Sequence, residues 1–415
     1  MKQTMQLLGG VVLALICAAH GMANGIPVGD PESVGMSSER LERIGQAMAK
    51  HIDAGNIQGA VTVVARHGQV VHFEAHGFMD ANRSRPMQKD ALFIMMSSTK
   101  PVLGVAAMIA IEEGLMRPSD PVSKYIPEYA EMQVAVLSDP SDADVSPLRV
   151  DRNEIPPHRT VPAVRPVTIH DLLTHTSGVS SGGLGAALAP RTERDTLASY
   201  IPKVGEQLLD FQPGSRWVYS GATGLDVVAR IIEIVTGQDY LAFVQARIFD
   251  PLGMVDTHYN VPSSKADRRV IIEGRDMARY FNKTTYFSGS YGLTSSARDY
   301  LHFEQMLING GALFGQRILS PRSVSRMASD QTDGLYRGFT QSDKGSGFGY
   351  TVAVVLDPIV ANSRRGKGAF GWGGAFGTRS WSDPVEGITG VLMLQQPHRG
   401  AQYDFENALQ QAIID

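Results

Sequence analysis

The sequence predicts an α+β protein, in which both ends of the chain contribute to one antiparallel sheet and a mostly helical segment is inserted between them. Short β-rich runs occur within 60–75 and return within 348–395, whereas residues 97–290 carry mainly helical patterns. Strands of one layer bury their apolar face against packed helices. We therefore expect a sheet lobe from residues 24–96 and 291–415, and an all-helical lobe from residues 97–290.

The composition is that of a soluble globular protein. Of 415 residues, 43% are apolar and 19% are charged, which is enough apolar material for a large core or two packed lobes. The formal net charge is −4, without a run of like charges. Nucleic acid and anionic membranes are therefore not expected as partners, because both are bound by basic patches. The oligomeric state is left open.

Residues 1–23 have the pattern of a cleaved secretory signal peptide. Lys2 is followed by the apolar run 7–19, and the small residues of Gly21-Met22-Ala23 form a cleavage site. The run is too short to span a bilayer comfortably, so we expect a periplasmic or secreted protein with no stable membrane span in the mature chain. The single cysteine, Cys17, lies inside this segment, which excludes disulfides and cysteine-ligated zinc from the mature chain.

A helix and a hairpin open the mature chain. Ser37 and Ser38 are good caps for a helix whose apolar residues share one face: Leu41, Ile44, Met48 and Ile52. Residues 60–65 and 69–75 are β-rich runs on either side of Arg66-His67-Gly68, which is typical of a hairpin.

The middle of the chain predicts a long loop and helices. Residues 136–166 are rich in Pro and Asp and have little periodicity, so a loop is expected there. Helices are expected at 225–235, stopped by Gly237, and at 240–249, capped by Asp239.

The C-terminal part predicts further helices and the second group of strands. Ser296 and Ser320 are caps of two helices. Strands are expected at 348–356, 368–372, 376–381 and 388–395. A last helix carries its apolar residues on one face: Phe405, Leu409, Ala412 and Ile413.

A serine and a lysine stand three residues apart in Ser97-Ser98-Thr99-Lys100, where the buried helix predicted through 102–113 begins. Residues i and i+3 are neighbours on a helix, so the Lys100 amine can reach the Ser97 oxygen. A serine becomes a good nucleophile beside a base, and a lysine is that base if burial leaves it neutral. The motif alone is a weak signal, and the competing interpretation is a capping serine followed by a solvated lysine.

Two further stretches are candidates for chemistry. Tyr219 follows a Pro-Gly turn and precedes the 225–235 helix, so its phenol can project from a loop and share the base role; the alternative is a half-buried core tyrosine. The glycines of 371–378 cluster where the predicted strand 368–372 ends and 376–381 begins, and glycines in a strand allow a close approach of the backbone. An acyl-transfer enzyme needs free N–H groups at such an edge, although a bulge or tight sheet packing explains the glycines equally well.

A second serine motif is rejected. Residues 178–182 fit the G-x-S-x-G nucleophile elbow, but that motif requires a strand before it and a helix after it, and the surrounding sequence predicts neither. His170 and His175 are five residues apart, which does not place them on one helical face, so both are interpreted as structural and no metal site is expected.

Taken together and in this order, Ser97-x-x-Lys100, Tyr219-Ser220-Gly221 and Trp372-Gly373-Gly374 resemble the motifs of penicillin-recognising serine hydrolases. The likeness is greatest to class C β-lactamases and family VIII carboxylesterases, and it covers roughly residues 30–415. It implies a β-lactamase/transpeptidase-like fold and an acyl-enzyme mechanism that needs no metal or cofactor.

The resemblance also implies a role for each motif residue. Ser97 would attack the carbonyl carbon, while Lys100 and Tyr219 would transfer the proton. The backbone N–H groups of Ser97 and Ala375 would form the oxyanion hole. The substrate would lie against the third motif: Trp372, Gly373 and Gly374.

Two departures from the β-lactamase pattern favour an ester as substrate. Gly221 stands where true β-lactamases usually have Asn, and Trp372 stands where they have Lys. An ammonium suits the carboxylate of a β-lactam, whereas an indole suits an apolar or neutral group. We therefore expect a carboxylesterase acting on small or short-chain acyl esters, although Arg379 or Lys367 could restore the missing charge.

Two alternatives remain open from the sequence. A β-lactamase, D-amino-acid peptidase or amide hydrolase of the same fold would use the same mechanism on another bond. A non-catalytic binding or scaffold protein that retains the fold would have lost a catalytic group, and none of Ser97, Lys100 and Tyr219 is missing.

Overall fold

The computed structural model describes residues 25–415 apart from 138–154, 180–182, 273–276, 282 and 340–343. The predicted signal peptide therefore lies outside the described residues, as do most of the predicted loop 136–166 and the serine of the rejected elbow. Among the described residues, none of the helices combines the length and the apolar character needed to cross a membrane.

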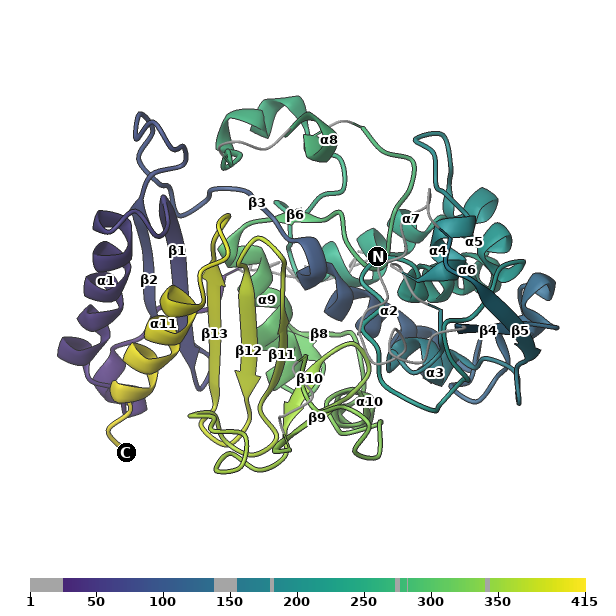
Figure 1. Cartoon of the computed structure of the whole chain (residues 1–415). Coiled ribbons are helices and arrows are strands. Elements are labelled where there is room, and N and C mark those ends of the chain that lie inside the picture. Colours follow the sequence, from purple (N-terminus) through teal and green to yellow (C-terminus); the bar gives the residue numbers. More distant parts are fainter. Residues whose placement is uncertain (1–24, 138–154, 180–182, 273–276, 282, 340–343) are drawn as a thin grey trace, which may run out of the picture.

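One seven-stranded sheet is built from both ends of the chain, which confirms the predicted fold class (Figure 1). The strand order is β2-β1-β13-β12-β11-β10-β9, and all neighbours are antiparallel. N-terminal and C-terminal strands meet where Val61 lies opposite Met393. The strands are β1 (Gly59–Arg66), β2 (Gln69–Gly77), β9 (Ser346–Phe348), β10 (Ala353–Val355), β11 (Phe370–Gly373), β12 (Arg379–Asp383) and β13 (Ile388–Met393).

Helices cover both faces of the sheet. α1 (Ser38–Asp53) and α11 (Arg399–Gln411) pack together on one face, and α9 (Ala297–Ile308) lies on the other (Figure 1). Successive side chains of a strand point to opposite faces. In β1, Val61 and Val63 accordingly belong to the large core on the α9 side, whereas Ala60 and Val64 belong to the core under α1 and α11: two cores thus share one sheet.

The predicted strand 348–356 is wrong in one respect, because the chain reverses inside it. β9 and β10 are joined by a tight turn in which the Gly349 N–H donates to Val352 O over 2.8 Å. Thr351 takes a φ of +71° in this turn. A left-handed conformation is uncommon for threonine, so it was not predicted from the sequence. The apolar residues of the turn are buried, as those of a strand would be. The apolar run 348–356 was therefore compatible both with one long strand and with two strands joined by a turn.

The regular structure in the middle of the chain is helical apart from one antiparallel pair of strands, Gln133–Leu137 and His158–Pro162, so the segment 97–290 is not all-helical as predicted. The caps are those expected: Gly237 ends α6 with a φ of +67°, and Asp239 accepts hydrogen bonds from the N–H groups of Leu241 and Ala242. The division into two lobes stays a prediction. The helices here are α2 (Lys100–Glu112), α3 (Ile169–Leu173), α4 (Leu184–Leu188), α5 (Leu197–Gly205), α6 (Gly224–Thr236), α7 (Tyr240–Val244) and α8 (Ala278–Phe281), with a π-helical turn at Gln245–Phe249 and a 3₁₀ helix, η7, at Ser263–Arg268.

Short strands and one further helix complete the fold. β4 (Gln133–Leu137) pairs with β5 (His158–Pro162), so the two ends of the predicted loop 136–166 are in fact antiparallel strands. The other strands are β3 (Phe93–Ile94), which pairs with β6 (Thr294–Ser295), and the hairpin of β7 (Ala312–Leu313) and β8 (Gln316–Arg317); the other α-helix is α10 (Pro321–Met327).

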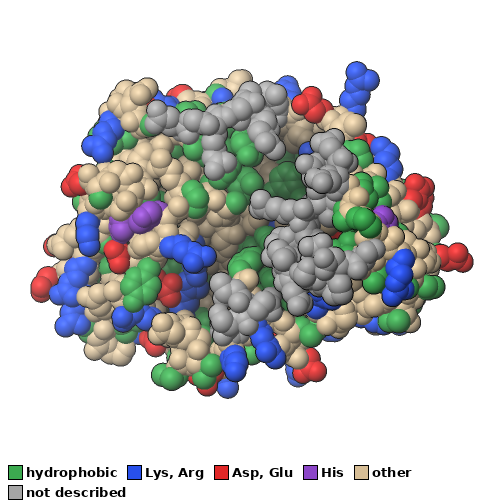
Figure 2. Space-filling view, in the orientation of Figure 1, with side chains coloured by type: hydrophobic (Ala, Val, Ile, Leu, Met, Phe, Trp, Pro, Cys, Tyr) green, Lys and Arg blue, Asp and Glu red, His purple; other side chains and the backbone are tan. Residues whose placement is uncertain are grey.

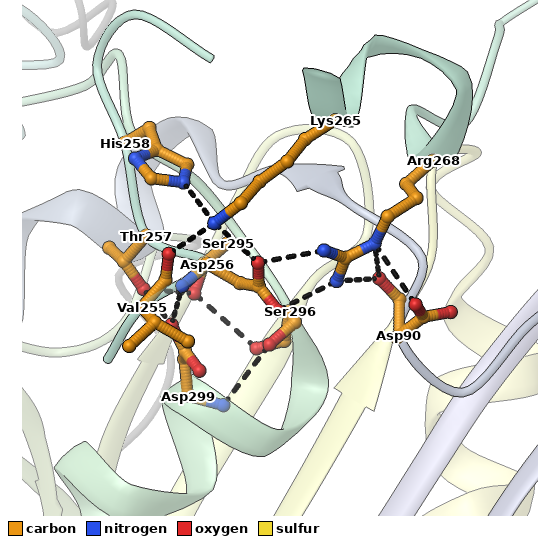
Figure 3. A network of polar contacts seen from close by, with 10 residues as sticks. All are labelled: Asp90, Val255, Asp256, Thr257, His258, Lys265, Arg268, Ser295, Ser296 and Asp299. Atoms are coloured by element: carbon orange, nitrogen blue, oxygen red, sulfur yellow. Dashed lines mark hydrogen bonds and ion pairs between the residues drawn. The ribbon is translucent and has the colours of Figure 1, made fainter. Parts of the chain in front are cut away.

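A network of ion pairs fixes the chain just before the Ser97 motif (Figure 3). Arg268 of η7 makes two bonds of 2.8 and 2.7 Å to the Asp256 carboxylate, and its Nε donates to the Asp90 carbonyl over 3.0 Å. The Asp256 N–H in turn donates to Asp299 in the first turn of α9 over 2.6 Å. Burial acts to raise the pKa of Asp256, but hydrogen bonds from Arg268 and Lys265 outweigh it and lower the pKa to about 2. The Asp256 carboxylate therefore stays ionised at neutral pH, and its ion pair with Arg268 fixes the segment at Asp90 that leads into β3.

Candidate active site

Ser97 lies in a 3₁₀ turn, η2 (Met96–Thr99), that leads directly into α2. The sequence placed Ser97 at the mouth of an α-helix as a possible cap, but the structure gives η2 and α2 no side-chain cap. Met96 has a φ of +47°, so the residue before the candidate nucleophile is held in a strained conformation. Ser97 itself is half-buried.

Lys100, the first residue of α2, is completely buried and points at Ser97. Its Nζ lies 3.3 Å from Ser97 Oγ and donates to the carbonyl oxygens of Gly221 and Ser290 over 2.8 and 2.9 Å. Of the three oxygens around Nζ, only that of the Ser97 hydroxyl carries a proton that could be exchanged. The predicted pair is therefore brought together, and the competing interpretation of a solvated lysine is wrong.

Asp226, on α6, holds one of the two acceptors and was missed by the sequence analysis. Its buried carboxylate accepts hydrogen bonds from the Ser288 hydroxyl (2.7 Å), the Tyr286 hydroxyl (2.8 Å) and the Ser290 N–H (3.1 Å). Burial raises the pKa of Asp226, while these hydrogen bonds and the Lys100 charge act in the opposite direction. The carboxylate thus shapes the turn whose carbonyl binds Lys100. An acidic residue in the first turn of a helix gave no signal of this contact.

Tyr219 lies beside Lys100 in a group of aromatic rings. The Lys100 Nζ is 5.0 Å from the centre of the Tyr219 ring, and the Trp372 indole N–H donates to the Tyr219 hydroxyl over 3.4 Å. A fully buried histidine, His175, packs edge-on against the ring at 4.9 Å. Burial, with a contribution from Lys100, holds the pKa of His175 well below its usual range, so this ring is neutral. The expectation that His175 is structural stays a prediction, and the structure places its ring against the candidate site.

The glycine-rich strand approaches η2 as closely as its sequence indicated. A Cβ at Gly374 would lie 2.2 Å from the Met95 carbonyl oxygen, so only glycine allows this approach. Thr378 fixes it, because its hydroxyl contacts Ser98 Oγ at 2.9 Å and donates to Met95 O over 3.2 Å. The β11–β12 turn, with the exposed Ala375, is therefore held beside the Ser97 segment.

Two apolar clusters flank this turn. The first, here called the aromatic cluster, has four buried members: Trp217, Tyr336, Phe348 and Trp372. Tyr219 packs against this cluster, and Phe339 packs at its edge against Tyr219 and Trp372. The second, here called the Phe376 cluster, includes Met96 and consists otherwise of Ile94, Ile272, Met277, Tyr280, Phe281 and Phe376. Figure 2 shows this face of the molecule hollowed near its centre, with apolar side chains visible in the hollow.

The charge missing at Trp372 is not replaced from the neighbouring strand. In the β11–β12 pair, Trp372 lies opposite Ser380 and Gly373 lies opposite Arg379, so the Trp372 and Arg379 side chains point to opposite faces of the sheet. Lys367 is exposed before β11 begins. The rejected elbow also lacks its strand, because α3 and a turn precede Gly178.

A model of the Beta-lactamase family matches residues 44–413. The chain belongs to the Beta-lactamase family. Among relatives in sequence, Protein Rv1367c of Mycobacterium tuberculosis is 33% identical over 83% of this chain and 87% of its own length. Esterase EstB of Burkholderia gladioli is 29% identical over 92% of this chain and 98% of its own, and Lovastatin esterase of Penicillium rubens is 28% identical over 83% and 90%.

Solved structures of similar proteins support the same fold for this member of the Beta-lactamase family. EstCE1, described as a hydrolase with promiscuous acyltransferase activity, superimposes with a TM-score of 0.71 at 23% identity, over 91% of this chain and 99% of its own. A family VIII carboxylesterase gives 0.69 at 18% identity, over 91% and 99%. The protein is thus a serine hydrolase of the β-lactamase/transpeptidase fold.

Proposed function

We propose that this Beta-lactamase family member is a carboxylesterase that forms an acyl-enzyme on Ser97. The observation that carries the proposal is the contact of 3.3 Å between Ser97 Oγ and Lys100 Nζ, made by a lysine whose two other hydrogen bonds are to backbone carbonyls. The two carbonyl oxygens orient the Lys100 amine toward Ser97 Oγ, where it can exchange the serine proton. Esterases among the sequence relatives support the same activity.

In the first half of the reaction, Ser97 Oγ attacks the ester carbonyl and its proton passes to the pair formed by Lys100 and Tyr219. The N–H groups of Ser97 and Ala375 stabilise the oxyanion, and collapse of the intermediate expels the alcohol, which takes up the proton. In the second half, water attacks the acyl carbonyl. The same pair accepts the proton of water and returns it to Ser97 Oγ, which releases the carboxylic acid.

The walls of the site favour small or short-chain acyl esters over charged substrates. The aromatic cluster lies on the Tyr219 side and the Phe376 cluster on the Met96 side, so apolar groups are available for both parts of an ester. Trp372 offers a ring and a neutral N–H in the place of an ammonium. A β-lactam carboxylate would therefore lack its counter-ion there.

The activity is tested by two measurements on the purified protein. We expect kcat/KM for p-nitrophenyl butyrate to exceed that for a chromogenic cephalosporin by about 100-fold or more. Trp372→Lys should lower this ratio, and Trp372→Phe, which keeps an aromatic ring, serves as its control. A preference of the wild-type protein for the cephalosporin would reverse the assignment.

The nucleophile is tested by labelling with a fluorophosphonate probe. Ser97→Ala should abolish both labelling and turnover, whereas Ser180→Ala, at the serine of the rejected elbow, should leave both unchanged. Labelling of the Ser97→Ala variant would show that another serine is the nucleophile.

We further propose that the protein is exported to the periplasm or secreted. The basic residue and apolar run of residues 1–23 support this location. Mass spectrometry of the protein from its host should find a chain that begins at Asn24, and a chain that retains residues 1–23 would contradict the proposal.

A further inference from the structure

A polar cluster lies between α1 and the edge strand β2, within an otherwise apolar helix–sheet contact. His72, Glu74 and His76 alternate along β2, so all three side chains point to the face that α1 covers. Thr62 of β1 is paired opposite Glu74 and points to the same face. Each of the three β2 residues offers a ligand atom, and these atoms lie within 4.8 Å of one another.

The distances within the cluster are close to those of a metal site. The Thr62 hydroxyl lies 2.7 Å from His72 Nε2 and 2.9 Å from His76 Nε2, and His76 Nε2 is 3.8 Å from a Glu74 carboxylate oxygen. Ligand atoms of tetrahedral zinc are about 3.3 Å apart, given bonds of about 2.0–2.1 Å. The side chains of His72, Glu74 and His76 would therefore coordinate one ion after shifts of between a fraction of an ångström and about an ångström.

The chemistry of the groups fits a transition metal better than a hard cation. Two imidazoles and one carboxylate are a common ligand set for zinc, whereas magnesium and calcium prefer oxygen ligands alone. Burial lowers the pKa of His72 to about 3 and that of His76 to about 4, so at neutral pH both rings have a lone pair to donate. The Glu74 side chain is half exposed, which gives an ion a path from solvent.

The helix above the cluster leaves room for it. Gly45 stands in the middle of α1, where glycine costs about 1 kcal/mol relative to alanine. A Cβ there would lie 3.2 Å from the Glu74 carboxylate and 3.7 Å from the His76 ring. Glycine thus brings the helix backbone close to the polar cluster at this position.

We propose that His72, Glu74 and His76 form a binding site for Zn²⁺, with Thr62 or water as the fourth ligand. In the metal-free protein, the single Thr62 proton can be donated to one imidazole only, so the other ring must donate its Nε2–H to the Thr62 oxygen. Coordination needs the Nε2 lone pair of both rings, so it moves one ring proton from Nε2 to Nδ1. The bound ion would join three residues of the edge strand beneath α1, on the sheet face opposite to α9.

The proposal is tested by titrating the full-length protein, without a histidine tag, with ZnCl₂ in competition with a chromogenic chelator. We expect one equivalent to bind with micromolar affinity or tighter and to raise Tm, while MgCl₂ has no effect. Substitution by Co²⁺ should give the visible absorption of a tetrahedral nitrogen and oxygen site. Failure of the wild-type protein to bind one equivalent would overturn the proposal.

Three variants assign the ligands. His72→Gln and His76→Gln should each weaken Zn²⁺ binding by about 100-fold or more, beyond the effect of outer-shell substitutions. Glu74→Gln, at a half-exposed side chain, should weaken it without disturbing the fold, and so remains informative if a histidine variant fails to fold. His67→Asn, at the exposed hairpin tip with a φ of +48°, is the control and should bind as the wild type does.

Unchanged binding by His76→Gln and Glu74→Gln would place the ion elsewhere. Esterase activity of all four variants should stay within about twofold of the wild type, because the cluster and Ser97 lie on different elements.

Discussion

At the scale of single residues, the candidate site depends on a few buried polar groups that orient one amine. Lys100 is placed by two carbonyl oxygens, and one of them belongs to a turn held by Asp226. Substitution of a residue that orients the Lys100 amine should therefore change the rate of proton transfer, and with it kcat, more than it changes substrate binding.

The role of the Tyr219 hydroxyl can be separated from that of its ring. Tyr219→Phe keeps the packing with His175 and Trp372 but removes the proposed proton carrier, so kcat for an ester should fall by about 100-fold or more. Stopped-flow or steady-state kinetics measure this loss, and the thermal transition should stay near that of the wild type. Tyr336→Phe removes a hydroxyl from the same aromatic cluster and should have a much smaller effect on kcat. Near-normal activity of Tyr219→Phe would end its proposed role.

Asp226 is predicted to act through the turn that it holds. Asp226→Asn keeps one acceptor oxygen but places an amide against the Ser288, Tyr286 and Ser290 donors, so the Ser290 carbonyl should shift away from Lys100. We expect kcat to fall by about 10-fold or more while KM changes little. The pH–rate profile should also shift, since the contacts of Lys100 change. A rise in KM alone would instead indicate a general loosening of the site.

At the scale of elements, one buried carboxyl joins α9 to the sheet. Glu304 accepts hydrogen bonds from Ser380 Oγ over 2.6 Å and from Ser382 Oγ over 2.9 Å, both on β12. Burial raises the pKa of Glu304 from 4.5 to about 7, although the two serine hydroxyls act to lower it. The folded protein therefore keeps a proton that the unfolded chain releases.

This raised pKa predicts that stability declines with pH in a defined range. The contribution of Glu304 is complete below pH 4.5 and is lost as pH rises through about 7, which amounts to about 3 kcal/mol at most. Glu304→Gln cannot ionise, so the fall in the free energy of unfolding between about pH 5 and pH 8 should be smaller in this variant. Urea denaturation at the two pH values measures the difference, with Glu128→Gln at an exposed position as control. The same pH dependence in both proteins would contradict the prediction.

The elements were largely predictable from the sequence, and the failures have a common cause. Caps such as Ser37, Ser296 and Asp239 satisfy backbone N–H groups locally, so short-range patterns located their helices. The Thr351 turn and the Met96 conformation are imposed by surrounding structure on residues that do not favour a positive φ. Asp226 likewise became recognisable only when residues 60 positions apart came into contact.

At the scale of the whole molecule, the two ends of the chain are held together by Arg66. This buried guanidinium donates to the carbonyl oxygens of Val34 and Gly35 over 2.9 and 2.6 Å and forms an ion pair with Asp415 at 2.9 Å. Its Nε also donates to Glu386 O over 3.1 Å, in the turn between β12 and β13. One side chain at the end of β1 thus contacts three separate segments.

Loss of Arg66 is expected to destabilise the sheet as a unit. Arg66→Met removes the side-chain donor to the buried Val34 carbonyl oxygen and breaks the contacts to Gly35, Glu386 and Asp415, which should lower the free energy of unfolding by about 2–3 kcal/mol. Arg85→Met is the matched control, because the Arg85 side chain is 38% exposed against 5% for Arg66, so its pair with Asp80 should contribute less than about 1 kcal/mol. Urea denaturation followed by circular dichroism compares the two variants. Equal losses of unfolding free energy in the two variants would indicate that the Arg66 contacts stabilise the protein no more than the Arg85 contacts do.

The pairing of β1 with β13 has a consequence for biosynthesis. The ribosome releases β1 and β2 early, but the strand that covers the inner edge of β1 is among the last to emerge. Until then, that edge presents unpaired backbone groups and an apolar surface to the cell, a state prone to aggregation. The nascent polypeptide should therefore depend on chaperone protection for nearly the full duration of translation, and it should complete its fold only after synthesis ends.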